Sequence, residues 1–161
     1  RLSAREEPGQ ALNTTTFQQG EERPPTADQF VYIVRNYDRE KIAGLCRQFD
    51  LDSPDHPILA GGDFTGLGYQ MLQGGQTDKA LEIFRMGTAA FPNSANAWDS
   101  YGEAYIAAGD NASALKYYRR ALEILPQDST INPALRDAIA NNVPAVIERL
   151  QAALSEQSEG N

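Results

Sequence analysis

The sequence predicts an all-α fold, a short superhelix built from stacked pairs of helices, and two observations support this prediction. Beyond residue 26, apolar residues recur at the spacing of amphipathic helices. From Gly61 onward the sequence also repeats itself, with a period of about 34 residues. A period of this length is typical of helical repeats, in which each unit buries its apolar face against its neighbour.

The internal repeat pairs residues of similar type at spaced positions. In chain order the pairs are Phe64 and Trp98, Leu67 and Tyr101, Gly68 and Gly102, Met71 and Tyr105, Ala80 and Ala114, Phe84 and Tyr118, Gly87 and Ala121, and Pro92 and Pro126. Glycine inside a helix costs about 1 kcal/mol relative to alanine, so its recurrence indicates a close approach of two helices. We expect the aromatic residues to fill the space between helices and the prolines to end the second helix of each unit.

This pattern resembles the tetratricopeptide repeat, with one unit at residues 61–94 and a second at residues 95–128. The resemblance implies a right-handed superhelix in which the first helices of the units line a concave groove. It also implies a function in protein–protein interaction, because that groove holds a peptide or a partner protein in this family.

The segments outside the repeats are expected to form tails and capping helices. Residues 1–26 are polar and contain several prolines, which predicts a disordered tail or linker. Residues 27–60 are predicted to form two helices and a loop. Residues 129–155 are predicted to form two capping helices, because the apolar ends of a short repeat array need polar caps. Residues 156–161 are predicted to be a frayed tail.

Apolar faces and helix signals place these flanking helices. The first face holds Phe30, Ile33, Val34 and Tyr37, and the second holds Ile42, Leu45, Cys46 and Phe49. Thr26 is the predicted N-cap of the first helix. Within the repeats the candidate N-caps are Thr77 in the first unit and either Asp110 or Asn111 in the second. Asn132 and Pro133 predict the start of a helix over residues 134–141, and Pro144 predicts the start of another over residues 145–154.

The tetratricopeptide resemblance also assigns the groove residues. They are Gly62, Thr65, Tyr69 and Leu72 in the first unit, and Asn96, Asp99, Glu103 and Ile106 in the second. This mixture of aromatic, aliphatic and acidic groups fits a helix or an extended peptide of neutral to basic character. The repeats that clamp a C-terminal carboxylate use lysine and asparagine in the groove, whereas two acids here would repel it, so we predict no carboxylate clamp. The alternative is that the groove is solvated or covered by the N-terminal segment of the chain.

The charge and the apolar content of the chain limit the classes of partner that it is expected to bind. The chain has 22 acidic and 14 basic residues, a net charge of −8, and the sequence shows no basic cluster. An acidic surface repels phosphate backbones and anionic lipid, which predicts no nucleic-acid partner. No apolar run is long enough to span a membrane, which predicts no membrane insertion. The single cysteine fits a reducing compartment, and it equally fits a periplasmic protein without disulfides.

Candidate chemistry is sparse, and the sequence predicts no enzyme, no metal and no cofactor. His56 lies in a loop with Asp50, Asp52 and Asp55, but this loop lacks the glycine and distal glutamate of a calcium-binding loop. Cys46 falls on an apolar face, which predicts a buried, inert thiol. The string from Ser113 to Lys116 matches the serine-x-x-lysine motif of penicillin-recognising enzymes, but their partner motifs are absent.

Two functions remain from the sequence. The first is a protein–protein interaction module that presents the groove to a peptide or partner. The alternative is an accessory or structural domain of a secreted or periplasmic hydrolase, an esterase or a serine β-lactamase-like protein, because the repeats resemble those appended to such enzymes. That likeness favours a periplasmic or secreted location over the cytoplasm. Because the chain begins at Arg1, we expect a processed or shortened form. Pairing of two copies through incompletely capped ends is also an option.

Overall fold

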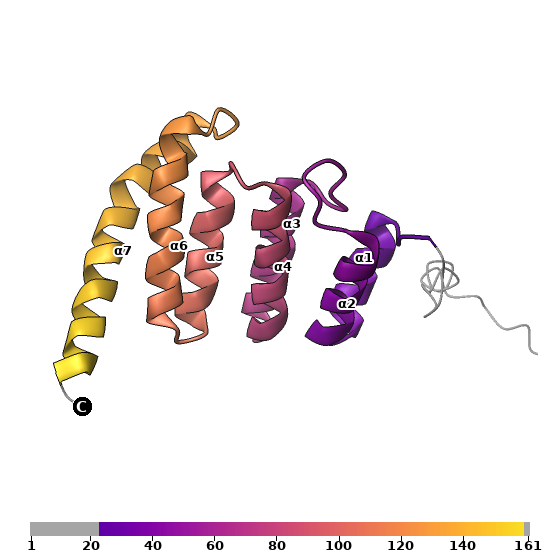
Figure 1. The fold of residues 1–161 in the computed structure, drawn as a ribbon, viewed down its shortest axis with the longest axis horizontal. Helices are drawn as coiled ribbons and strands as arrows, with labels where there is room; N and C mark the ends of the chain where they lie inside the picture. The colour runs from indigo at the N-terminus through magenta and orange to yellow at the C-terminus, as the bar shows by residue number, and fades with distance from the viewer. Residues whose placement is uncertain (1–22, 160–161) are drawn as a thin grey trace, which may run out of the picture.

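The computed structural model describes residues 23–159, and all regular secondary structure in this part of the chain is helical. The helices are α1 (Ala27–Asn36), α2 (Arg39–Phe49), α3 (Gly61–Gln73), α4 (Thr77–Ala90), α5 (Ala95–Ala107), α6 (Asn111–Ile124), the 3-10 turn η2 (Leu125–Gln127) and α7 (Pro133–Glu159). Successive helices pair, and the pairs stand side by side in a row (Figure 1). The all-α prediction is confirmed, with a tetratricopeptide-like arrangement of pairs.

The helix boundaries follow the repeat closely. The pair α3–α4 recurs one period later as α5–α6, with both helices starting and ending at equivalent positions. The first helix α1 also begins one period before α3, and Phe30 occupies the place of Phe64 in it. Both side chains are fully buried. The repeat recognised in the sequence starts at Gly61. In the structure α1 also keeps the register of the repeat, although it lies at the N-terminal end of the stack of helices.

A glycine of one helix lies against an aromatic ring of the next in each repeat. A Cβ atom placed on Gly68 would lie 2.6 Å from the Phe84 ring, and one placed on Gly102 would lie 3.0 Å from the Tyr118 ring. The Gly68 distance is shorter than a carbon–carbon contact allows, so a side chain there would force the Phe84 ring to move. The Gly102 distance is tighter than most such contacts, so glycine also favours the close approach of α5 and α6. The predicted role of the paired glycines and aromatic residues is confirmed.

Side-chain caps fix where five of the described helices begin, including α2, capped by Asp38, and α5, capped by Ser94. The Thr26 hydroxyl accepts the Gln29 backbone N–H at 3.3 Å, and a carboxylate oxygen of Asp110 accepts the N–H of Ser113 at 2.9 Å. Asn132 caps α7 in the same way. These three predicted caps are confirmed. The expectation for Thr77 is wrong, because it is the first residue of α4 and the N-cap position before it makes no side-chain hydrogen bond.

The two predicted capping helices after residue 129 are in fact one helix, α7, which continues through Pro144 to Glu159. Proline removes one backbone hydrogen bond, but Pro144 is exposed, so its ring meets solvent. Ile139, Val143 and Leu150 are buried along one continuous helical stripe. That stripe keeps its register across the proline, which explains why the helix does not break. Residues 156–159, which were predicted to be a frayed tail, therefore belong to α7.

The register of the repeat fails after α6 because the connection to α7 is longer than the connection between the repeats. The buried Asp128 carboxylate fixes this connection, accepting the backbone N–H of Ala95 at 2.8 Å and that of Thr130 at 2.9 Å. Burial favours the neutral acid, but the hydrogen bond from the Thr130 hydroxyl, together with those from the backbone, outweighs it and lowers the pKa of Asp128. When the extra residues of this connection are left out of the count, α7 corresponds to the first helix of a further repeat. Ile139 of α7 then occupies the position of Tyr101 in α5.

Two expectations at the N-terminal end need correction. Tyr37 was expected on the buried face of the first helix, but it lies just beyond α1 as its C-cap residue and is 41% exposed. Most of the expected disordered tail, residues 1–22, lies outside the described residues. Within the described part, Pro25 is buried, so packing begins before Thr26.

Two alanine substitutions in α3 test the close approach. We expect Gly68→Ala to lower the free energy of unfolding by about 1–3 kcal/mol, because the added methyl group collides with Phe84. Gly66→Ala is the matched control, since a Cβ there meets nothing within 4 Å, and it should raise stability by about 0.5–1 kcal/mol. Urea unfolding measures both values, and equal effects of the two substitutions would refute the assigned packing.

Candidate functional site

The predicted groove residues lie on α3 and α5, and the structure links four of them across the two helices. The Tyr69 hydroxyl donates to a Glu103 carboxylate oxygen at 2.6 Å, and these residues occupy equivalent positions in the two repeats. The Asn96 side-chain amide donates to the Thr65 hydroxyl at 3.5 Å. The surface formed by α1, α3 and α5 is called the first-helix face below, and the surface formed by α2, α4 and α6 the second-helix face.

Tyr69 is part of the wall of the first-helix face. Its ring packs edge-on against Phe84, with 5.2 Å between ring centroids, and its hydroxyl also reaches Ser100 at 3.3 Å. Burial raises the pKa of the Tyr69 hydroxyl, and the hydrogen bond to Glu103 raises it further. The phenol is therefore a neutral donor that holds the Glu103 carboxylate in place.

Asp99 places a half-buried carboxylate on the first-helix face. Within residues 23–159 this carboxylate accepts no hydrogen bond and forms no ion pair. Burial raises the pKa of Asp99 to about 6, and the negative charge of Glu103 adds to the rise. A half-buried carboxylate without a cation is a position where a positively charged ligand group would gain energy.

Apolar surface adjoins these acids. Ile106 is 40% exposed and follows Glu103 by about one turn of α5, while the half-buried Leu72 follows Tyr69 by the same distance on α3. Gly62, the remaining predicted groove residue, lines a small cleft of about 360 Å³ between α1 and α3. The predicted residues thus fall into an acidic centre, an aliphatic margin and one position in a neighbouring cleft.

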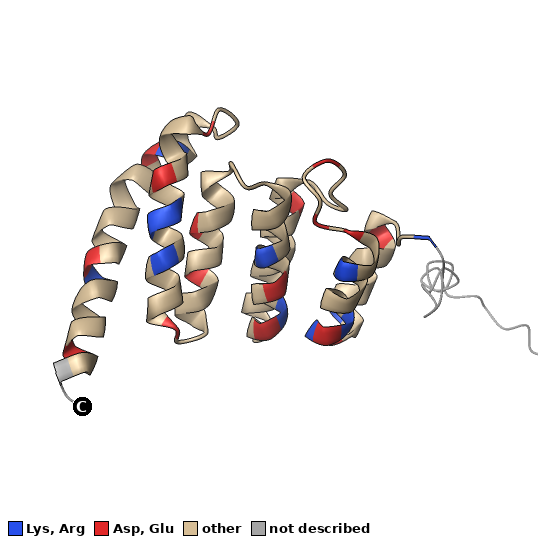
Figure 2. Cartoon of the chain, in the orientation of Figure 1, with Lys and Arg blue, Asp and Glu red and all other residues tan. Residues whose placement is uncertain are grey.

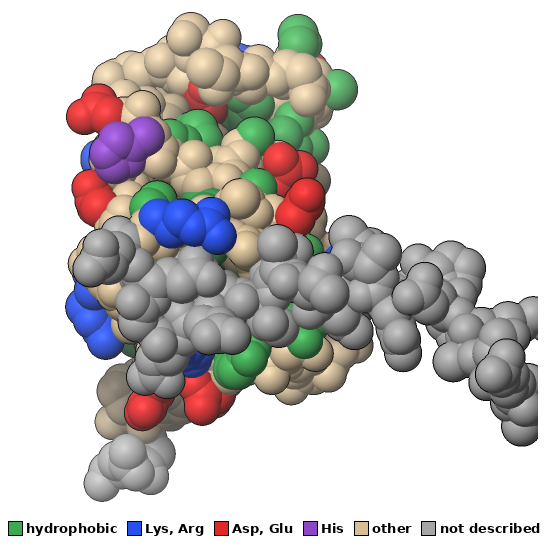
Figure 3. Space-filling model, turned by 90° about the vertical axis from the view of Figure 1, so that its right-hand side faces the viewer, with side chains coloured by type: hydrophobic (Ala, Val, Ile, Leu, Met, Phe, Trp, Pro, Cys, Tyr) green, Lys and Arg blue, Asp and Glu red, His purple; other side chains and the backbone are tan. Residues whose placement is uncertain are grey.

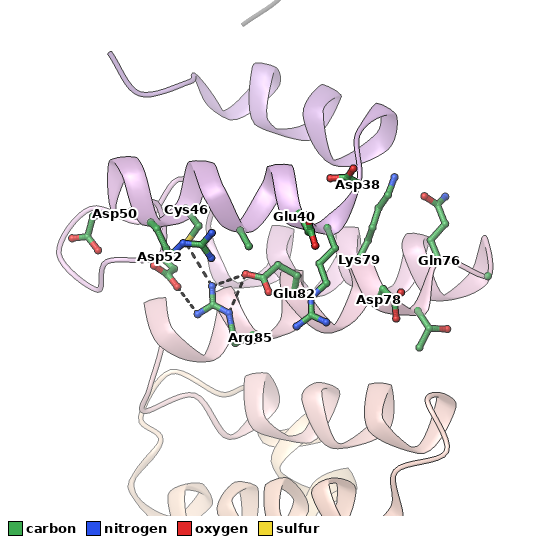
Figure 4. Close-up of a pocket in the computed structure, with 15 residues that line it drawn as sticks. Asp38, Glu40, Cys46, Asp50, Asp52, Gln76, Asp78, Lys79, Glu82 and Arg85 are labelled. Atoms are coloured by element: carbon green, nitrogen blue, oxygen red, sulfur yellow. Dashed lines mark hydrogen bonds and ion pairs between the residues drawn. The ribbon is translucent and has the colours of Figure 1, made fainter. Parts of the chain in front are cut away.

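Sequence reasoning missed the clefts on the second-helix face. One of about 1420 Å³ lies between α2 and α4 (Figure 4). Arg85 crosses it, donating to Asp52 at 2.9 Å, to the buried Glu82 at 2.7 Å and to the Cys46 sulfur at 3.6 Å. Arg39 also pairs with Glu82 at 3.6 Å. These contacts join α2, its following loop and α4, so the network holds the N-terminal pair onto the first repeat.

The structure places the Cys46 thiol in the core and His56 at the surface. Cys46 is buried, as predicted, and burial together with the Asp52 carboxylate raises the pKa of its thiol to about 11, so the thiol stays protonated at neutral pH. His56 is exposed at the N-terminal end of the stack, where acidic side chains lie near the histidine (Figure 3). Residues 23–159 contain no group of three metal-ligating side chains placed to hold an ion.

A second cleft on the second-helix face lies between α4 and α6 and has a volume of about 790 Å³. Its charged lining residues are Arg85, Lys116, Arg120 and Glu123, and they stand around aromatic rings. Arg85 is already paired with Asp52 and Glu82. The sequence run from Lys116 to Arg120 already interleaves basic and aromatic residues. The expectation that basic residues do not cluster is therefore wrong locally, because α4 and α6 bring these side chains to one cleft.

Comparison with known proteins supports the helical-repeat assignment. Residues 95–138 match the family model described as tetratricopeptide repeat, and this segment holds α5, α6 and the start of α7. The human protein O-mannosyl-transferase TMTC1 is 29% identical over 129 residues, which cover 80% of this chain and 14% of that protein. Mouse Superkiller complex protein 3 is 38% identical over 63 residues, which cover 39% of this chain and 4% of that protein.

These curated relatives are much longer proteins, and the chain spans only a small part of each. What the comparisons add is the class of the repeat. The matched family and the recurrence of α3–α4 as α5–α6 agree on tetratricopeptide-type helix pairs. No helix within residues 23–159 combines the length and the apolar character required to cross a membrane.

The raised pKa of Asp99 makes a testable prediction about stability and pH. Asp99 has a pKa of about 6 in the folded chain, against about 3.9 in an unfolded chain. Between these values the folded state keeps a proton that the unfolded state loses, so stability falls as pH rises. We expect Asp99→Asn to be more stable than the wild type at neutral pH by about 1–2 kcal/mol.

Urea unfolding of both proteins across about pH 4 to 7 measures this effect. The difference should shrink towards the acidic end, where the folded chain holds the proton on Asp99 and about half of the unfolded chains hold it too. A difference in stability that stays constant over the whole range would contradict the assigned burial of the carboxylate.

Proposed function

We propose that the chain is a protein-binding module whose first-helix face accepts a peptide segment or partner protein of neutral to basic character. The observation that supports this proposal most directly is Asp99, a half-buried carboxylate beside Glu103 with no cation partner among the described residues. The tetratricopeptide match supports the same class of function, since such repeats present extended surfaces to other proteins.

The chemistry of this face favours a ligand that carries a cationic group next to an aliphatic one. A lysine or arginine side chain that reached Asp99 would compensate a charge whose burial is unfavourable. Leu72 and Ile106 would contact the aliphatic part of the same ligand. A C-terminal carboxylate would instead be repelled by both acids, so the proposal retains the absence of a carboxylate clamp.

The proposal assigns no catalysis and no cofactor to the chain. TMTC1 is named as a transferase, but the chain spans 14% of that protein, so its activity is not carried over. The alternative, an accessory domain of a secreted or periplasmic hydrolase, gains no support from the names of these relatives. It also has no feature of the described residues in its favour, whereas the binding module has the acidic and aliphatic surface of α3 and α5.

Selection from a displayed library of short random peptides tests the proposal. Immobilised full chain should enrich peptides that carry lysine or arginine beside aliphatic residues. Synthetic copies of these peptides should bind the double variant Asp99→Asn/Glu103→Gln about tenfold or more weakly than the wild type. Glutamine keeps an acceptor oxygen for Tyr69, so the variant removes charge while preserving the shape of the face.

Glu40→Gln is the matched control, since it removes an exposed acid on α2 and should leave the affinity unchanged. Binding to the wild type should also weaken with added salt and as Asp99 is protonated below about pH 6. Equal affinity and equal salt dependence in the wild type and the double variant would reject an electrostatic first-helix face.

A further inference from the structure

The cleft between α4 and α6, on the second-helix face, has an aromatic floor. Trp98 and Tyr117 stack with 5.9 Å between ring centroids and 18° between ring planes, and Tyr101 lies 4.4 Å from Tyr117. The Trp98 indole N–H donates to the Pro92 carbonyl at 2.8 Å, which fixes the orientation of that ring. This cleft is open and is built from both repeats, because α4 belongs to the first and α5 and α6 to the second.

Cations stand over these rings. The Lys116 ammonium lies 5.3 Å from the Tyr117 centroid, and the Arg120 guanidinium lies 5.8 Å from the Trp98 centroid. Arg120 also pairs with Glu123 at 2.9 Å, whereas Lys116 forms no ion pair within the described part of the chain. Figure 2 shows the basic segments of α6 and α4, the two helices that flank the cleft, in a chain whose net charge is −8.

We propose that the α4–α6 cleft is a second docking site, which takes an acidic segment of a partner protein anchored by an aromatic or aliphatic side chain. The anchor would pack beside the aromatic side chains, between the two cations, and carboxylates next to it would pair with Lys116 and would compete with Glu123 for Arg120. Charge complementarity favours this occupant, because a cation held over a ring still has free N–H donors on its outer side. This site differs from the first-helix face in position and in the sign of its charge.

A single-stranded nucleic acid is the competing occupant, since basic residues interleaved with aromatic ones are typical of such sites. Two observations favour the peptide. Bases bind by stacking on open ring faces, but here Lys116 and Arg120 stand over the rings, and Trp98 and Tyr117 stack on each other. The acidic remainder of the chain would also repel a long phosphate backbone more than a short acidic segment.

The experiment separates this cleft from the first-helix face. A library of short random peptides is selected on the full chain carrying Asp99→Asn/Glu103→Gln, so that the proposed basic-peptide surface is disabled. Enriched sequences should combine aspartate or glutamate with an aromatic or aliphatic residue. Because Trp98 is the only tryptophan, binding of a synthetic tryptophan-free copy should change the intrinsic tryptophan fluorescence of the chain.

Three charge reversals on α6 identify the contact. Lys116→Glu and Arg120→Glu should each weaken binding of the acidic peptide by about tenfold or more. Arg119→Glu is the matched control, since Arg119 is equally exposed on α6 but does not line the cleft, and it should change the affinity by less than about threefold. All three positions are exposed, so the variants should fold like the parent, which circular dichroism verifies.

Several results would overturn the proposal. The library could enrich no sequence, or it could enrich basic sequences. The selected peptide could bind without changing the Trp98 fluorescence, or all three charge reversals could weaken its binding equally. Titration with a short oligothymidylate tests the competing occupant, and binding that is tighter than that of the peptide and lost in Lys116→Glu would assign the cleft to nucleic acid. The double variant Asp99→Asn/Glu103→Gln changes only the first-helix face. Whether or not it loses basic-peptide binding, the test of the α4–α6 cleft is unchanged, so the two proposals can fail separately.

Discussion

The fold depends on one repeated contact within the helix pair of each repeat. An aromatic ring of the second helix packs directly against a glycine of the first helix. Gly68 with Phe84 and Gly102 with Tyr118 make this contact at equivalent positions of the two repeats. The missing side chain allows two helices to approach at the cost of some helix propensity, and the ring fills the space between them. Since both pairs have the same geometry, they stack in the same orientation, and equivalent residues of α3 and α5 become neighbours.

That regularity explains why so much of the fold could be predicted. The period placed both helix pairs, and single capping residues such as Thr26 and Asn132 placed two flanking helices. Prediction failed where the period was interrupted. The longer connection held by Asp128 shifts α7 out of register, so its equivalence to a further first helix was not predicted. Pro144 then suggested a helix start, although buried residues on both sides of it keep one stripe.

For the candidate sites, too, the repeat pattern predicted some features and missed others. Repeat positions assigned Tyr69 and Glu103 to one groove. They did not predict that the two residues share a hydrogen bond or that Asp99 has no cation partner among the described residues. The α4–α6 cleft was missed because periodicity assigns Trp98 to the core. Its half-buried ring contacts Arg120 of α6, and this contact depends on how α5 and α6 pack together rather than on local sequence. The result is a thin array with an acidic face on its first helices and a cationic cleft between its second helices.

A double-mutant cycle between Gly68 and Phe84 tests the central contact most directly. The free energy of unfolding is measured for the wild type, both single variants and the Gly68→Ala/Phe84→Leu double variant. If the ring occupies the space of the missing methyl group, the alanine substitution should cost at least about 1 kcal/mol less beside leucine than beside phenylalanine. An alanine cost that is the same in both backgrounds would show that the ring does not set the approach of the helices.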